Sequence, residues 1–320
     1  MQSTTARSAA ISVRGLTKTY GSRTVVDGLD IDVPRGAIAG FVGPNGAGKT
    51  TTMAMLLGLV RPTAGGGEVL GEPIDHPPSY VTRVGALIES PAFYPSMTGR
   101  ENLRLLATVG GLDQSTIDVA LDEVGLSDRG DDRYRNYSLG MKQRLGIAAG
   151  LIGDPELLIL DEPANGLDPE GVREMRALLG GMSHRGRTVL VSSHDLSELE
   201  QICDYLVLID TGRSLFQGPT TELLADGGRA RVVVVPERTD DTERLRELIV
   251  LDGCKVERTG GRGLIVAASD GASPGTAPTT DELAATINRA AFDAGIILVE
   301  LHPDRITLED QFLSMIGANR

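Results

Sequence analysis

The 320-residue sequence contains no tryptophan, two cysteines and few aromatic side chains, which make up 3% of the chain. So few aromatics argue against a platform on which single-stranded nucleic acids stack their bases. Cys203 and Cys254 have no metal-binding spacing, which indicates plain thiols in a reducing compartment. No stretch approaches the ~20 consecutive apolar residues that cross a bilayer. The first residues, MQSTTARSAAISVRG, lack the apolar segment of a signal peptide. We therefore expect a cytoplasmic protein that reaches a membrane only through a partner.

Positive charge is also in short supply. The chain has 31 Lys and Arg against 44 Asp and Glu, a net charge of −13. Such a balance gives no long-range attraction to nucleic acid or to anionic lipid, so we expect neither as the main partner. With 41% hydrophobic residues, the chain is long enough to bury a core in each of two domains.

The first two thirds of the chain alternate short apolar runs with helical patterns, which is typical of an α/β domain with a mainly parallel sheet. We assign this domain to residues 1–218. Thr98 and Glu101 have the spacing of a capping box and predict a helix with Leu103, Leu106 and Ala107 on one face. That helix opens a helical insert at about 95–155. The predicted strands are 38–42, 157–160, 189–192 and 205–209, and a helix is predicted at 50–59.

Residues 219–320 follow a different pattern, which predicts a small α+β domain. Strands are expected at 231–235, 255–257, 264–267 and 296–301, and helices at 242–250 and 281–294. A loop rich in Gly, Pro and Ser fills 269–278. This βαββαβ order is typical of a ferredoxin-like accessory domain. It carries no catalytic constellation, and its role stays open.

The segment after the first predicted strand fits the phosphate-binding pattern G-x-x-x-x-G-K-[ST] and opens a helix. Glycines let backbone N–H groups converge on phosphate oxygens, and the helix N-terminus adds positive potential. A lysine at this place reaches the β/γ-phosphates, and the following hydroxyl binds Mg²⁺. The predicted nucleotide-binding residues are Gly43, Pro44, Asn45, Gly46, Ala47, Gly48, Lys49, Thr50 and Thr51.

The strand at 157–160 is fully apolar and ends in Asp161 and Glu162. Ligands in such sheets bind at the carboxyl ends of strands, beside the phosphate loop. Adjacent residues on a strand point in opposite directions, so one carboxylate can reach a metal while the other faces an attacking water. We therefore predict Asp161 as a ligand of Mg²⁺, directly or through water, and Glu162 as the general base.

Residues 9–218, with motifs in strict order, resemble the nucleotide-binding subunit of an ABC transporter, in the subgroup for drug or peptide-antibiotic export or lantibiotic immunity. The resemblance implies ATP and Mg²⁺ as ligands, Lys49 and His194 as catalytic residues that touch phosphate, and Tyr20 as the ring that stacks on adenine. Ser138 and Gly140, in YSLGMKQR, and Asp168, in NGLD, match motifs that face the nucleotide of a second copy. It also implies a head-to-tail homodimer, and a separately encoded permease that holds the chain at the inner face of the membrane.

The sequence departs from the family pattern at two places. Glu89 stands where the family usually has a glutamine that contacts Mg²⁺ and water, so we expect Glu89 among the catalytic and metal-binding residues. Some antibiotic-immunity members are similar in having this glutamate. Leu139 and Met141 replace the usual glycine and glutamine of the signature, and Leu139 narrows the room for close backbone approach.

Two other functions remain as alternatives. One is a soluble ABC-type ATPase that acts on nucleic acid or ribosomes, but such proteins commonly carry two ATPase cores and basic surfaces. The other is a small P-loop kinase or GTPase, but the chain lacks an N/T-K-x-D guanine-reading motif, and that class would not explain Ser138 together with His194.

Overall fold

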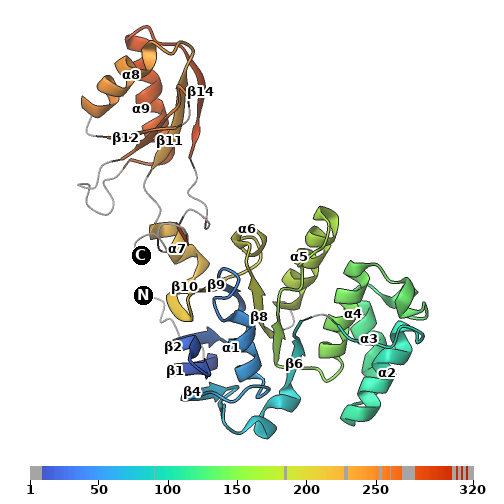
Figure 1. Cartoon of the computed structure of the whole chain (residues 1–320). Coiled ribbons are helices and arrows are strands. Elements are labelled where there is room, and N and C mark those ends of the chain that lie inside the picture. The colour runs from blue at the N-terminus through green and yellow to red at the C-terminus, as the bar shows by residue number, and fades with distance from the viewer. Residues whose placement is uncertain are drawn as a thin grey trace, which may run out of the picture. The chain divides into compact units, whose positions relative to one another are not determined.

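The structure is a computed structural model that describes residues 9–89, 91–183, 186–226, 230–251, 254–259, 261–268 and 278–304, together with residues 308, 311, 312 and 315 (Figure 1). It divides into two compact units. The first comprises Met1–Thr221 with Phe312–Arg320, and the second comprises Glu222–Gln311. The division therefore falls just after the predicted boundary at 218, and the end of the chain groups with the first unit. The predicted loop at 269–278 lies outside the described residues, apart from Pro278.

A six-stranded sheet with the order β10-β9-β3-β8-β7-β6 forms the centre of the first unit. All neighbouring pairs are parallel except β9 and β10. Strands β3 and β7 are buried along their whole length because they are apolar on both faces, as parallel sheets require. The strands are β3 (Ile38–Val42), β6 (Val84–Leu87), β7 (Leu157–Leu160), β8 (Thr188–Ser193), β9 (Tyr205–Asp210) and β10 (Arg213–Pro219). The predicted mainly parallel α/β fold is confirmed.

A second, antiparallel sheet with the order β2-β1-β4-β5 completes the core of this unit. We did not predict it. Its strands are β1 (Ala9–Tyr20), β2 (Arg23–Pro34), β4 (Ala64–Val69) and β5 (Glu72–Pro73). The buried side chains of β1 and β2, among them Ile11, Leu16 and Ile31, join those of β3 in one hydrophobic cluster.

The helical insert is built from α2 (Gly99–Gly110), α3 (Thr116–Glu123) and α4 (Leu139–Leu151), which Figure 1 shows in green beside β6. The capping box of Thr98 and Glu101 is present: each side chain accepts a hydrogen bond from the other residue's backbone N–H. Leu103 and Ala107 are buried, but Leu106, which we placed on the same face, is 42% exposed. Leu106, three residues after Leu103 and one before Ala107, lies on the rim of a groove described below, so the prediction that it shares their face was wrong.

The second unit has the predicted βαββαβ order. Its sheet order, β12-β13-β11-β14, with every neighbouring pair antiparallel, is that of a ferredoxin-like fold. Helices α8 and α9 bury Leu245, Ile249, Leu283 and Ile287 against one face of this sheet. The elements are β11 (Arg231–Pro236), α8 (Asp241–Leu251), β12 (Lys255–Arg258), β13 (Leu264–Ala267), α9 (Thr280–Asp293) and β14 (Leu298–Pro303).

The remaining helices connect the strands of the first unit, except α7, which crosses into the second. They are α1 (Lys49–Leu56), α5 (Pro169–Ser183), α6 (Leu196–Leu199) and α7 (Thr220–Asp226). Short 3₁₀ turns are η1 (Pro77–Ser79), η2 (Val81–Arg83), η3 (Ser127–Arg129) and η4 (Tyr134–Asn136).

Candidate active site

The carboxyl ends of four neighbouring parallel strands meet at one edge of the large sheet. Strand β3 runs into the loop that begins at Gly43, β7 is followed by Asp161 and Glu162, and β8 is followed by His194. Strand β6, at the edge of the sheet, is followed two residues later by Glu89. Parallel pairing therefore brings together residues that are far apart in the sequence, such as Gly43 and His194.

The predicted phosphate-binding loop, which begins at Gly43, leads directly into α1. Gly48 has φ +100° immediately before the helix, and a Cβ atom there would lie 2.9 Å from the Val25 carbonyl oxygen, so only glycine fits without strain. The Lys49 side chain is 5% exposed and curls back over the loop. Its Nζ atom donates hydrogen bonds to the carbonyl oxygens of Gly43, at 2.7 Å, and Pro44, at 3.4 Å. The first N–H groups of a helix have no partner within it, so those of α1 are available to a ligand at the end that the loop adjoins.

Asp161 joins this loop to the strand ends. Its Oδ2 atom accepts a hydrogen bond from Thr50 Oγ1 at 2.6 Å, and its Oδ1 atom accepts one from Ser192 Oγ at 2.6 Å. Asp161 is buried, as is Ser192. A hydroxyl and a carboxylate in contact are hard oxygen donors of the type that Mg²⁺ prefers, so this pair fits the predicted metal site.

Glu162 occupies a strained backbone position and contacts two basic groups. Its φ of +48° lies in the left-handed region, which is uncommon for a residue with a side chain. Its Oε1 atom lies 3.2 Å from Lys49 Nζ, and its Oε2 atom lies 2.6 Å from His194 Nδ1. Three of the predicted catalytic residues thus form one continuous chain of polar contacts.

A cavity of about 260 Å³ opens beside this chain of contacts. Most of its lining was predicted, but Arg23 and Val25 were not, and neither were the hydrogen bonds of Ser192 with Asp161 and Glu162. A valine in a strand and a serine at a strand end carry no distinctive pattern in the sequence. The cavity is lined by Arg23, Val25, Asn45, Gly46, Gly48, Lys49, Thr50, Thr51 and Glu162.

Tyr20 lies near this cavity but not in its lining. It ends β1, pairs in register with Arg23 at the start of β2, and is 49% exposed. Lys18 Nζ lies 4.9 Å from the centre of the Tyr20 ring. Register therefore places the predicted adenine-stacking ring opposite a residue that lines the cavity.

Glu89 is exposed and has φ +60°. It stands next to the carboxylate pair along the sheet edge, because the Asp161 N–H donates a 2.8 Å hydrogen bond to the Leu87 carbonyl oxygen. The structure does not bring its side chain into the lining of the cavity.

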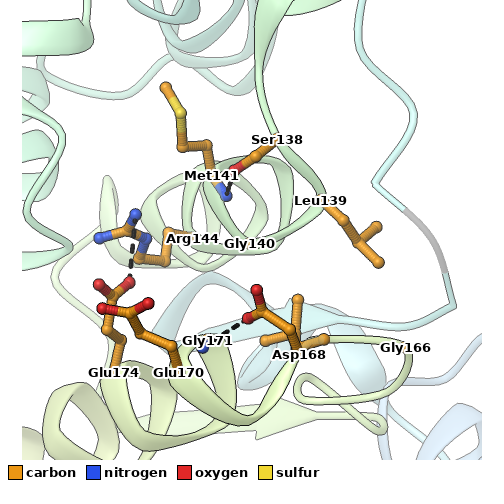
Figure 2. Close-up of a pocket in the computed structure, with 11 residues that line it drawn as sticks. Ser138, Leu139, Gly140, Met141, Arg144, Gly166, Asp168, Glu170, Gly171 and Glu174 are labelled. Carbon is orange, nitrogen blue, oxygen red and sulfur yellow. Dashed lines mark hydrogen bonds and ion pairs between the residues drawn. The ribbon is translucent and has the colours of Figure 1, made fainter.

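A second, separate pocket of about 470 Å³ gathers the residues predicted to face a second copy (Figure 2). Ser138 caps α4, its Oγ atom accepting a 3.2 Å hydrogen bond from the Met141 N–H. Asp168 caps α5, its Oδ1 atom accepting a 2.8 Å bond from the Gly171 N–H. Leu139 is 47% exposed and extends toward Gly166 on the opposite wall. Ser138, Gly140 and Asp168 therefore share one pocket, distinct from the cavity at Lys49.

Within the residues that the structure describes, no helix is both long and apolar enough to cross a membrane.

Comparison with known proteins identifies relatives of the chain. Residues 26–165 match the model of the ABC transporter family. The bacitracin transport ATP-binding protein BcrA of Bacillus licheniformis is 47% identical over 219 residues, covering 68% of this chain and 72% of the relative. The daunorubicin resistance ATP-binding protein DrrA3 of Streptomyces coeruleorubidus is 37% identical over 322 residues, covering 97% of each chain and thus both units.

Solved structures resemble the chain as well. CbiO1 from Clostridium perfringens, part of the ABC transporter complex CbiONQ, superposes with a TM-score of 0.64 at 26% identity, over 76% of this chain and 96% of that one. An ATP-binding subunit of an ABC transporter gives a TM-score of 0.60 at 30% identity, over 68% and 93%. The chain belongs to the ABC transporter family, as an ATP-binding subunit with ATPase activity.

Proposed function

We propose that this chain hydrolyses Mg·ATP at the Lys49 cavity as one half of a homodimer, and that the dimer drives a separate membrane permease that exports an antibiotic, peptide or other hydrophobic compound. The observation that carries the ATPase assignment is the continuous set of contacts from Thr50 and Asp161 through Ser192 to Glu162, Lys49 and His194. The names of the relatives, for bacitracin transport and daunorubicin resistance, support export.

In this proposal the phosphates lie against the loop and the N-terminus of α1. Backbone N–H groups and the Lys49 ammonium bind the β- and γ-phosphates. Thr50 and Asp161 hold Mg²⁺, which neutralises phosphate charge when it is bound. Tyr20 stacks on adenine.

Glu162 acts as the general base toward the attacking water. Its carboxylate is oriented by His194 on one oxygen and by Lys49 on the other. His194 also reaches the γ-phosphate, so loss of that phosphate changes the contacts of the same histidine. Glu89 completes the Mg²⁺ and water contacts from the adjoining strand end.

The position of the signature residues supports the proposal of a second copy. Ser138, Gly140 and Asp168 line a pocket of their own and do not line the Lys49 cavity of the same chain. The N-terminus of α4, with its positive potential, can act on a nucleotide only when another copy presents one. Closure of two copies head-to-tail around two ATP molecules satisfies this requirement in both sites.

The experiment for this proposal uses Glu162→Gln, which keeps the size of the side chain and removes the base. General-base catalysis contributes about 10²–10⁴ in rate, so we expect turnover to fall by that factor while Mg·ATP binding persists. The variant should then sediment as a dimer with Mg·ATP and as a monomer without it. Normal turnover in Glu162→Gln would overturn the base assignment, and a variant that stays monomeric at saturating Mg·ATP would overturn the dimer.

The permease is proposed to dock at a groove of about 400 Å³ between the sheet edge and the helical insert. Its walls come from β6, the η2 turn, α2 and α4, and its rim carries the exposed side chains of Val81 and Leu106. The backbones of β6 and α4 approach closely at Gly85 and Gly150, which supports the proposal that movement of α4 reaches the strand that leads to Glu89.

Docking is tested with Leu106→Glu. The charge should abolish co-purification with the separately encoded permease, while the isolated subunit keeps its ATPase activity. Retained co-purification would place the permease elsewhere. Export itself is tested in cells: the pair of proteins should raise resistance to the transported antibiotic, and the Glu162→Gln version should not.

A further inference from the structure

Ser192 lies within the central sheet, directly beneath the two acidic residues. It is the fifth residue of β8, which pairs with β3 on one side and β7 on the other. It stands opposite Phe41 of β3 and one residue beyond the Val191–Leu160 pair with β7. The residue is fully buried, so its hydroxyl has no contact with solvent and must find its partners inside the protein.

The Ser192 hydroxyl makes two hydrogen bonds, and their direction is fixed by the count of protons. The Glu162 N–H donates to Ser192 Oγ at 2.9 Å. Ser192 Oγ lies 2.6 Å from Asp161 Oδ1, and a hydroxyl carries one proton, so that proton points to the carboxylate. Asp161, through its side chain, and Glu162, through its backbone N–H, are therefore both hydrogen-bonded to Ser192 Oγ.

For Asp161 the bond fixes the rotation of the carboxylate. With Oδ1 bonded to Ser192, Oδ2 faces Thr50 Oγ1 at 2.6 Å, on the side of the phosphate loop. Without Ser192 a buried carboxylate oxygen would lose its donor, and the group would be free to turn.

For Glu162 the bond fixes the backbone. The left-handed φ of +48° directs the side chain of Glu162 between Lys49 and His194, and such a conformation persists only where the surroundings hold it. The Ser192 oxygen accepts the N–H of this strained residue and is the side-chain contact that holds it from below.

We propose that Ser192 is a positioning residue for ATP hydrolysis. It holds the metal-binding carboxylate of Asp161 and the base Glu162 in a fixed position relative to each other. This inference rests on the roles proposed above for Asp161 and Glu162. Ser192 does not line the Lys49 cavity, so it acts through these two residues and not on the nucleotide.

The test compares Ser192→Ala with Ser192→Thr, which keeps the hydroxyl, in the full-length protein. Loss of a hydrogen bond to such supporting groups typically lowers activity or metal affinity by about 10–100-fold. We expect Ser192→Ala to lower kcat by about that factor and to raise the Mg²⁺ concentration for half-maximal activity. Binding of the fluorescent analogue mant-ATP without Mg²⁺ should stay unchanged, and Ser192→Thr should recover most of kcat.

Thr188→Val is the matched control for structural damage. Thr188 lies at the opposite end of β8, is buried, and its Oγ1 atom accepts a 2.9 Å hydrogen bond from the Gly36 N–H. Thr188→Val therefore loses one buried hydrogen bond in the same strand, away from the site. Turnover is expressed per mant-ATP-binding molecule, so unfolded protein does not enter the comparison. We expect Thr188→Val to keep the wild-type kcat and the wild-type Mg²⁺ requirement.

Two results would overturn the proposal: Ser192→Ala with kcat within twofold of wild type, or Thr188→Val with an equal loss of kcat. Glu162→Gln is measured in parallel. If that variant is inactive while Ser192→Ala is normal, the role of Ser192 alone is wrong. If Glu162→Gln is fully active, the proposed base role of Glu162 fails, and the role of Ser192 that rests on it fails with it.

Discussion

The ammonium group of Lys18 lies 4.9 Å from the centre of the Tyr20 ring, and the same nitrogen donates a 2.7 Å hydrogen bond to the Arg61 carbonyl oxygen. The cation therefore occupies one face of the ring while the backbone of another segment holds it in place. Such an arrangement is attractive because the ring face carries negative potential. Tyr20 is 49% exposed, so part of the residue stays accessible to a flat heteroaromatic ligand.

Tyr20→Ala should weaken ATP binding. Stacking of a base on an aromatic side chain is worth about 1–3 kcal/mol, so we expect the Kd for mant-ATP to rise by about 5- to 150-fold. Tyr20→Phe keeps the ring and should bind within about twofold of wild type. Lys18→Met should have a smaller effect than Tyr20→Ala, because the ring remains. Equal affinity of Tyr20→Ala and wild type would exclude stacking at this position.

Glu89→Gln should change the response to Mg²⁺. Both side chains offer an oxygen, but the amide lacks the negative charge that strengthens binding of a hard cation. We expect a several-fold rise in the Mg²⁺ concentration that gives half-maximal ATPase activity. The left-handed backbone at this position is retained, because the two residues differ only at the side-chain terminus. An unchanged Mg²⁺ titration would show that Glu89 stays away from the metal, as its position outside the cavity lining allows.

Arg187→Met should destabilise the first unit. Arg187, 11% exposed, forms an ion pair with Glu123 of α3, 7% exposed, and a second with Asp154 at 2.8 Å. Removing one partner of a buried pair costs about 3–5 kcal/mol. Urea denaturation should therefore give a lower unfolding free energy by about that amount.

Arg83→Met is the control for Arg187→Met. Arg83 pairs with Glu156 at 3.1 Å, but both side chains are partly exposed, so the loss should stay below about 1 kcal/mol. Equal destabilisation by the two substitutions would contradict a special role for the pair that joins the helical insert to the start of β8.

Stability should fall at alkaline pH because of Cys203. Burial raises the pKa of this thiol, and the nearby Asp204 raises it further. The thiol thus stays neutral in the folded protein, while the unfolded chain ionises near the ordinary pKa of about 8.5. The contribution of the neutral Cys203 thiol to the free energy of unfolding is fully present below that pH and is lost as the pH rises above it.

Between pH 7 and pH 10 we expect the ionisation of Cys203 in the unfolded chain to lower the unfolding free energy by about 1–2 kcal/mol. The measurement compares the pH dependence of the unfolding free energy in wild type and in Cys203→Ala. The decline should be shallower in Cys203→Ala and unchanged in Cys254→Ser, whose thiol is only partly buried. Parallel curves for wild type and Cys203→Ala would refute the assignment.

The elements predicted well from the sequence are those whose pattern depends on nearby residues. Strands β3 and β7 are unbroken apolar runs, and both are buried throughout. The loop before α1 needs glycine at defined places, so its position follows from spacing alone. The end of α1 was placed too late, at residue 59, because the helix stops at Leu56 and the chain turns through Gly58 at φ +72°.

The elements missed depend on pairing between distant segments. Strands β1 and β2 shift register several times, which interrupts the alternation by which a strand is recognised. Strand β4 contains three consecutive glycines, a pattern that predicts a turn more than a strand. Ser192 has no local pattern of its own, because its importance comes from lying beside the end of β7.

The placement of β3 in the middle of the sheet has a consequence for synthesis on the ribosome. One of its two neighbours, β8, begins at Thr188, and the other, β9, begins at Tyr205, long after β3 ends at Val42. At about 5–20 residues per second, the nascent strand waits on the order of ten seconds with both edges unpaired. Five apolar residues exposed for that time are a binding site for chaperones, so slower translation of the helical insert should lower the yield of folded protein.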